Sequence, residues 1–107
     1  MKNPLETAEY FIYLREFDKA KIVLDLLKPY AKTLEDMDKL GKLYSEVRAF
    51  DESLKLGKAI YAMLPENGNR FDARTNIIRA HLHLNQPLEA LDLVLENEKE
   101  KPNDHPN

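Results

Sequence analysis

Apolar residues recur every three or four positions along most of the chain, which is the spacing that gathers them on one face of an α-helix. Proline and glycine are sparse, and several prolines fall between these stretches, where they separate helices rather than interrupt them. The pattern therefore predicts an all-α fold. The expected helices cover about residues 4–14, 18–30, 34–48, 51–63, 70–84 and 87–99.

The first turn of a helix leaves backbone N–H groups unpaired, and residues at the expected helix starts either accept hydrogen bonds from these groups or have no N–H themselves. Asn3 and Thr33 can accept hydrogen bonds as N-caps, while Pro4 and Pro87 have no N–H to satisfy. Pro29 falls in the last expected turn of the second helix, and we expect that helix to continue past it to about residue 30. Short connections then make neighbouring helices antiparallel, so the chain is expected to form helix hairpins.

The hairpins repeat one arrangement of large and small residues. In each, a large residue of the first helix precedes a small residue of the second helix by nine positions, and the small residue lets the two helices cross closely. The three pairs are Phe11 with Ala20, Tyr44 with Ser53, and His81 with Ala90. The large residues are spaced by 33 and then 37 positions, so three related hairpins are expected at about residues 4–30, 34–63 and 70–99.

The second hairpin carries the fullest set of motif residues, which are Leu40, Gly41, Tyr44, Phe50 and Pro65. In kind and spacing these resemble the tetratricopeptide repeat (TPR) family, whose unit is about 34 residues long. Ser53 and Gly57 depart from the Ala and Phe usual in that family. The other two hairpins match less fully, so the chain resembles three degenerate TPR repeats, and an irregular six-helix bundle is the alternative.

The resemblance implies a single domain over residues 1–100, in which the three hairpins stack as a right-handed superhelical array. It also implies that the first helices of the hairpins line a concave groove where a peptide segment of a partner protein docks. The residues expected to line this groove are Glu9, Ile12, Tyr13, Lys42, Ser45, Glu46, Thr75, Arg79 and His83. Residues 101–107 contain two prolines and no other apolar residue, and we expect them to form a disordered tail.

The composition limits the cellular location and the classes of partner that we expect for this protein. Without cysteine the chain can form neither a disulfide nor a thiolate metal site, and a cytoplasmic location fits this composition. The net charge is only -3, so the chain lacks the positive electrostatic field that non-specific nucleic-acid binding needs. No apolar run reaches the length of a signal peptide or a membrane span. We therefore expect neither a nucleic-acid partner nor a membrane partner.

The residues that carry chemistry are not arranged for catalysis. No motif brings a nucleophile beside a base, and the three glycines stand alone rather than in a phosphate loop. His81 and His83 lie two apart on a helix and point in different directions, so they cannot bind one metal ion together. The residues that would form a chaperone-tail clamp in the TPR family are also missing. We predict no enzyme, no cofactor, no metal and no chaperone-tail clamp.

The last expected helix is apolar around most of its circumference, and no amphipathic helix follows it in this sequence. The candidates for an association surface are therefore Leu88, Leu91 and Leu95. They are expected to pack against a second copy of the chain, as a homodimer, or against another protein. The predicted function is a non-catalytic protein–protein interaction module, a scaffold or adaptor. The alternative is a regulatory, targeting or oligomerisation region of a larger enzyme or assembly. A nucleic-acid-binding repeat, using Arg70, Arg74 and Arg79, is the third hypothesis.

Overall fold

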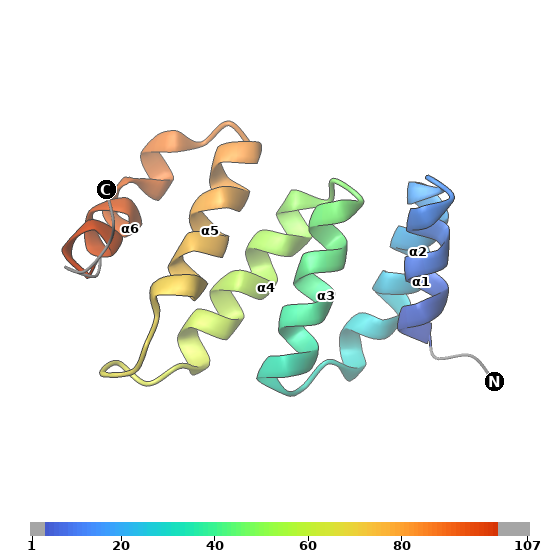
Figure 1. The fold of residues 1–107 in the computed structure, drawn as a ribbon, viewed down its shortest axis with the longest axis horizontal. Coiled ribbons are helices and arrows are strands. Elements are labelled where there is room, and N and C mark those ends of the chain that lie inside the picture. The colour runs from blue at the N-terminus through green and yellow to red at the C-terminus, as the bar shows by residue number, and fades with distance from the viewer. Residues whose placement is uncertain (1–3, 101–107) are drawn as a thin grey trace, which may run out of the picture.

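The computed structural model describes residues 4–100, and this part of the chain contains helices and turns but no strand (Figure 1). The helices are α1 (Pro4–Tyr13), α2 (Phe17–Leu27), α3 (Leu34–Glu46), α4 (Phe50–Met63), α5 (Phe71–His83) and α6 (Pro87–Lys99), with a 3-10 turn η1 (Lys28–Tyr30) after α2. The predicted all-α class is confirmed. The expected N-cap Asn3 and the expected tail at 101–107 lie outside the described residues.

The helices are arranged as successive antiparallel pairs along the longest axis of the molecule. Figure 1 shows α1 with α2 at one end, α3 with α4 in the middle, and α5 with α6 at the other end. The molecule measures 46 × 28 × 26 Å with a radius of gyration of 15.1 Å. A compact domain of about 100 residues has a radius of gyration near 13 Å, so these hairpins form an elongated row.

Helix α2 ends earlier than the sequence predicts. The sequence predicts that it reaches residue 30, but its α-helical bonding stops at Leu27, and residues 28–30 form the 3-10 turn η1. Pro29 lies within η1 and has no N–H to donate to an α-helical acceptor. The N–H of Ala31 instead donates to the carbonyl of Lys28 at 3.2 Å, which closes the tighter turn.

The three hairpin turns use the same backbone conformation. Arg15, Arg48 and Asn85 have positive φ angles of 63°, 68° and 61°. The next residue in each turn donates its N–H to the carbonyl of Phe11, Tyr44 or His81, at 2.8, 2.9 and 2.8 Å. This is the bond that closes a helix C-terminus in the Schellman motif. The large residues at 33- and 37-residue spacing thus also accept the closing bond of each hairpin.

Glycine at these turn positions should stabilise the fold. A left-handed conformation costs a residue with a Cβ atom about 1–2 kcal/mol, and glycine adopts it without that cost. We expect Arg48→Gly to raise the free energy of unfolding by roughly 0.5–1 kcal/mol after the greater entropy of unfolded glycine is counted. Asn85→Gly should gain less, because asparagine tolerates this conformation. Urea unfolding followed by circular dichroism measures both, and destabilisation by Arg48→Gly would contradict the assignment.

Small residues stand where the paired helices cross. Ala20 and Ala90 are fully or almost fully buried, as close crossing requires. At the matching position of the middle hairpin, the hydroxyl of Ser53 lies 2.7 Å from that of Ser45, so the two serines share a hydrogen bond. The small position of the middle hairpin therefore lies where its two helices meet.

Two polar contacts join the first hairpin to the second. The buried hydroxyl of Tyr44 donates to Asp25 at 2.6 Å, and Lys28 lies 2.8 Å from Glu52. Burial raises the pKa of the Asp25 carboxyl, but hydrogen bonds from Tyr44 and Lys21 outweigh it, so this pKa is lowered overall. Burial and the bond to Asp25 raise the pKa of Tyr44. These side chains hold α2 against α3 and α4.

The second and third hairpins meet at a much closer approach of helix backbones. Gly57 of α4 is buried, and a Cβ atom added there would lie 3.2 Å from Cγ1 of Ile77 on α5. Beside this contact, Arg70 donates to the carbonyls of Tyr61 and Leu64 at the end of α4, at 3.3 and 3.0 Å. Its guanidinium also lies 4.3 Å from the ring centre of Tyr61. Arg70 therefore closes the C-terminus of α4.

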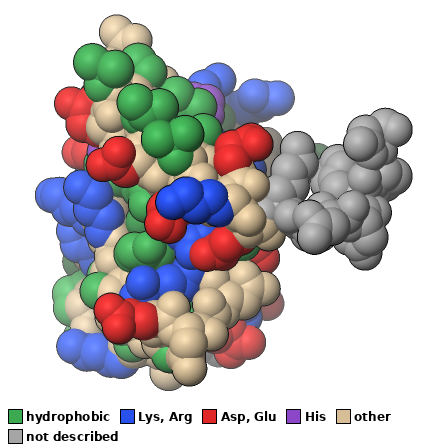
Figure 2. All heavy atoms as spheres, turned by 90° about the vertical axis from the view of Figure 1, so that its left-hand side faces the viewer, with side chains coloured by type: hydrophobic (Ala, Val, Ile, Leu, Met, Phe, Trp, Pro, Cys, Tyr) green, Lys and Arg blue, Asp and Glu red, His purple; other side chains and the backbone are tan. Residues whose placement is uncertain are grey.

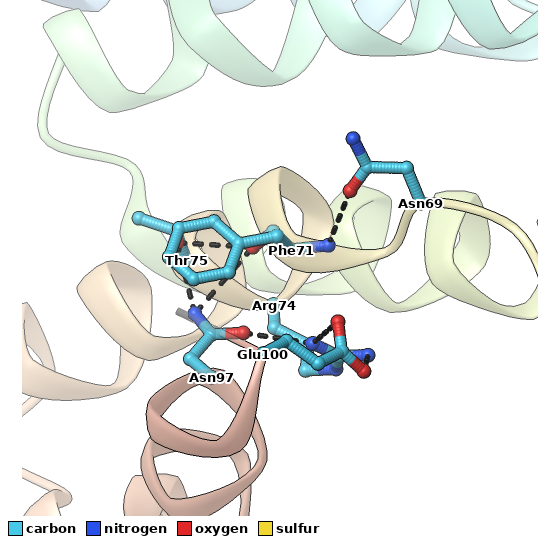
Figure 3. Close-up of polar contacts among 6 residues, drawn as sticks. All are labelled: Asn69, Phe71, Arg74, Thr75, Asn97 and Glu100. Atoms are coloured by element: carbon cyan, nitrogen blue, oxygen red, sulfur yellow. Dashed lines mark hydrogen bonds and ion pairs between the residues drawn. The ribbon is translucent and has the colours of Figure 1, made fainter. Parts of the chain in front are cut away.

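A polar network fastens α5 to α6 (Figure 3). The guanidinium of Arg74 is buried, donates to both carboxylate oxygens of Glu100 at 2.9 and 2.7 Å, and donates to Asn97 at 2.9 Å. Asn97 in turn donates to the hydroxyl of Thr75 at 3.0 Å. The hydrogen bond from Arg74 lowers the pKa of the Glu100 carboxyl. All four side chains are hydrogen-bonded to one another across α5 and α6, so the cluster holds these two helices together.

Candidate functional site

A groove of about 310 Å³ lies between α3, α4 and α5. Four of the predicted groove residues line it, namely Lys42, Ser45 and Glu46 from α3 and Arg79 from α5. The other lining residues are Asp38, Gly41, Phe50, Ser53, Leu56, Gly57, Ile60, Asn76 and Ala80. Its floor is formed partly by α4, whose Leu56 and Ile60 are apolar, whereas the charged side chains come from α3 and α5.

The charges around this groove are of both signs. Lys42 lies 3.0 Å from Asp38, one turn earlier on α3, and both partners are partly exposed. Arg79 donates to Asn76 at 3.3 Å. Within residues 4–100, neither Arg79 nor Glu46 has an oppositely charged group within 4 Å. A guanidinium and a carboxylate of this groove therefore remain open to an incoming ligand.

The lined surface continues from α3 to α1. Glu9 shares a depression of about 400 Å³ with Lys42 and Glu46. Ile12 and Tyr13 share another, of about 460 Å³, with Glu46. Glu46 lines all three depressions, so they adjoin one another. The structure thus brings seven of the predicted groove residues to three adjoining depressions lined from α1, α3 and α5.

Two residues expected in the groove are engaged with neighbours. The ring of His83 stacks on Phe50, with centroids 4.0 Å apart and planes 3° from parallel, so one face of the imidazole is covered. Phe50 itself lines the groove, which places His83 beside it. The hydroxyl of Thr75 donates to the carbonyl of Phe71 and accepts from Asn97. Thr75 therefore belongs to the network between α5 and α6.

The groove also contains residues that sequence reasoning missed. Leu56 and Ile60 were overlooked because the resemblance points only to the first helix of each hairpin. Their spacing from Ser53 and Gly57 was the available signal, since residues three and four apart share a helix face. Asn76 lies one turn before Arg79 and lines the same groove. The second helix of the middle hairpin thus contributes apolar surface that the sequence pattern did not assign to the site.

The predicted self-association residues lie on the end of the molecule formed by α6. Leu88, Leu91 and Leu95 are all exposed, Leu88 by 80%. Figure 2 views this end and shows hydrophobic side chains gathered toward its upper part, with acidic and basic groups elsewhere. The α6 end therefore presents apolar side chains to solvent within the described part of the chain.

The three arginines behind the nucleic-acid hypothesis do not form one surface. Arg70 closes the end of α4, Arg74 is buried, and only Arg79 is exposed. Residues 4–100 contain no group of three His, Asp or Glu side chains placed to hold a metal ion. No helix in this range is both long enough and apolar enough to cross a membrane.

Comparison with known proteins identifies no relative: no family model, no curated protein and no solved structure matches the chain.

Proposed function

We propose that the chain is a non-catalytic protein-interaction module, a scaffold or adaptor, whose groove binds a peptide segment of a partner protein. The observation that carries this proposal is the set of three depressions that share Glu46 and bring together side chains of α1, α3 and α5. Three TPR-like hairpins stacked as a right-handed array would produce such a surface on their first helices. The shared turn geometry of the hairpins supports that arrangement.

The chemistry of the groove favours a peptide with an apolar side chain beside an acidic one. Leu56 and Ile60 offer an apolar floor, and Arg79 at the rim has no carboxylate partner among the described residues. A carboxylate can accept two parallel hydrogen bonds from a guanidinium, which gives both attraction and orientation. Tyr13 is 80% exposed and can add its ring to the contact.

A double variant tests the groove. We expect Tyr13→Ala with Arg79→Ala to weaken binding by about tenfold or more, since truncated aromatic and arginine anchors cost over 1 kcal/mol each. Both side chains are exposed, so helicity and melting temperature should stay nearly unchanged. Peptides selected from a displayed random library provide the probe, and their dissociation constants are measured by fluorescence polarisation.

The matched control is Tyr30→Ala with Lys55→Ala. It removes the same kinds of side chain from exposed positions that do not line the groove. Binding should survive this change. Equal affinity of the groove variant and the control variant would contradict the proposal, as would failure of the folded protein to select any peptide.

A further inference from the structure

Both ends of the row of hairpins expose apolar side chains. At the C-terminal end Leu82 is 56% exposed, and Leu91 and Leu95 are 49% and 52% exposed. At the N-terminal end Tyr10 and Leu14 are 56% and 46% exposed. Apolar patches of this kind on a soluble protein mark interaction surfaces.

The contacts between the first and second hairpins show what such an end packs against. Asp25 on α2 and Lys28 at the start of η1 face the second hairpin, where they meet Tyr44 and Glu52. By the repeat spacing of 33 and 37 residues, the positions on α6 that match Asp25 and Lys28 are Leu95 and Glu98. Leu95 and Glu98 therefore occupy the places from which a following hairpin would be held.

The first hairpin carries the complementary residues. The positions that match Tyr44 and Glu52, 33 residues earlier, are Phe11 and Lys19. In the same register, Leu95 of one copy would lie on Phe11 of another, and Glu98 would face Lys19. The hydroxyl–carboxylate contact is thus replaced by two apolar groups, and the lysine–glutamate pair is kept with its charges exchanged. Lys19 can turn toward Glu98 of another copy, because its described ion pair is a long 3.8 Å contact with exposed Glu16.

The first helices of the hairpins match in the same way. Leu43 on α3 and Val47, the residue after α3, are buried in the core against which Ile12 packs. In the first hairpin the positions that match Leu43 and Val47 are Tyr10 on α1 and Leu14 just after it. In the third hairpin the position that matches Ile12 is Leu82 on α5. All three matching residues are exposed at the ends. The exposed residues therefore stand at the positions whose counterparts make the internal junction.

We propose that the C-terminal end of one copy binds the N-terminal end of a second copy, which continues the row of hairpins head to tail. Such a contact joins two different surfaces, so each added copy leaves one end open, and assembly proceeds to chains or rings rather than stopping at a dimer. Pairing of α6 with α6 about a two-fold axis would instead stop at a dimer. The association uses the ends of the row and is independent of the groove.

Two single variants that block opposite ends test this directly. Leu14→Glu disables the N-terminal end and Leu95→Glu the C-terminal end, and both side chains are about half exposed, so both proteins should fold. By light scattering and sedimentation over rising concentration, we expect the unaltered chain to form species larger than dimers. Each variant alone should remain monomeric, whereas an equimolar mixture should form a one-to-one complex through its intact ends. Leu26→Glu, exposed on α2 outside both ends, is the control and should associate like the unaltered chain.

A charge exchange tests the register. Glu98→Lys places two lysines face to face and should weaken association by roughly threefold to tenfold, and adding Lys19→Glu to the same chain should restore it. A strict monomer at all concentrations would overturn the proposal. So would dimerisation of Leu14→Glu alone, since that indicates two-fold pairing of α6, or a mixture of the two end variants that stays monomeric. Far-ultraviolet circular dichroism confirms that each variant is folded.

Discussion

Gly57→Val lowers the free energy of unfolding by about 2 kcal/mol, the range expected when methyl groups are forced into a packed interior. Even the first added carbon would lie 3.2 Å from Cγ1 of Ile77, closer than ordinary van der Waals contact. Valine adds two further methyl groups, and its side chain has little freedom to turn away inside a helix. Either α5 moves away from α4, or Ile77 leaves its present position. Both responses loosen the junction of the second and third hairpins.

The matched control is Gly41→Ala on α3. A Cβ atom there would meet Cβ of Leu56 at 3.7 Å, which is ordinary contact. Alanine favours a helix interior over glycine by up to about 1 kcal/mol, so this variant should be more stable than the parent chain. Urea unfolding at equal protein concentration gives both values. If Gly57→Val proved as stable as Gly41→Ala, the close approach of α4 and α5 would be wrong.

Tyr44→Ala should lower the free energy of unfolding by about 3–5 kcal/mol, the usual cost of removing a large buried aromatic side chain. Tyr44 is fully buried and its hydroxyl donates to Asp25, so truncation removes core volume and a link between hairpins together. Tyr44→Phe keeps the ring and removes only the hydroxyl, which should cost about 1–2 kcal/mol. Chemical unfolding of the two variants separates the packing of the ring from the hydrogen bond.

The effect of Tyr44→Phe should depend on pH. The pKa of Asp25 is lowered in the folded chain, so the stability from its ionised form is complete above the ordinary carboxyl pKa of about 3.9. It is lost as the pH falls through the lowered folded value. The difference between Tyr44→Phe and the parent should therefore be largest near neutral pH and shrink in acid. A difference that stays constant down to the acid transition would show that Asp25 does not accept this bond.

At alkaline pH the stability of the fold should depend on the ionisation of Tyr44. Burial and the bond to Asp25 raise the pKa of its hydroxyl above the ordinary value of about 10. The stability from the neutral phenol is complete below that ordinary value and is lost as the pH rises toward the raised one. This dependence should be absent from Tyr44→Phe, which provides an internal check on the assignment.

The helices were predictable because their signals are local. Periodic apolar residues and the turns between them specify each helix within its own stretch of sequence, and the bounds differ by only a few residues. The remaining errors have backbone causes. Pro29 ends the α-helical bonding of α2, and the positive φ angle of Arg48 ends α3 two residues before the predicted bound.

The groove was predictable only in part. Lys42, Glu46 and Arg79 come together as expected because their positions repeat along the first helices. The role of Arg74 could not be read from its neighbours, since its main partner Glu100 lies 26 residues away. At the matching position of the middle hairpin stands Met37, a buried apolar residue. A charged residue at a core position signals a buried pair, but the sequence alone does not say which carboxylate completes it.

The common closure of the three hairpins has a consequence for how such a chain can change over time. The closing bonds join main-chain atoms, and their turn residues are two arginines and an asparagine. Side chains at the turns are therefore free to drift by mutation while the main chain keeps its path. A duplicated hairpin can lose nearly all sequence likeness to its parent in this way. What persists is the left-handed turn itself, since the three turns keep it although they lie 33 and 37 residues apart.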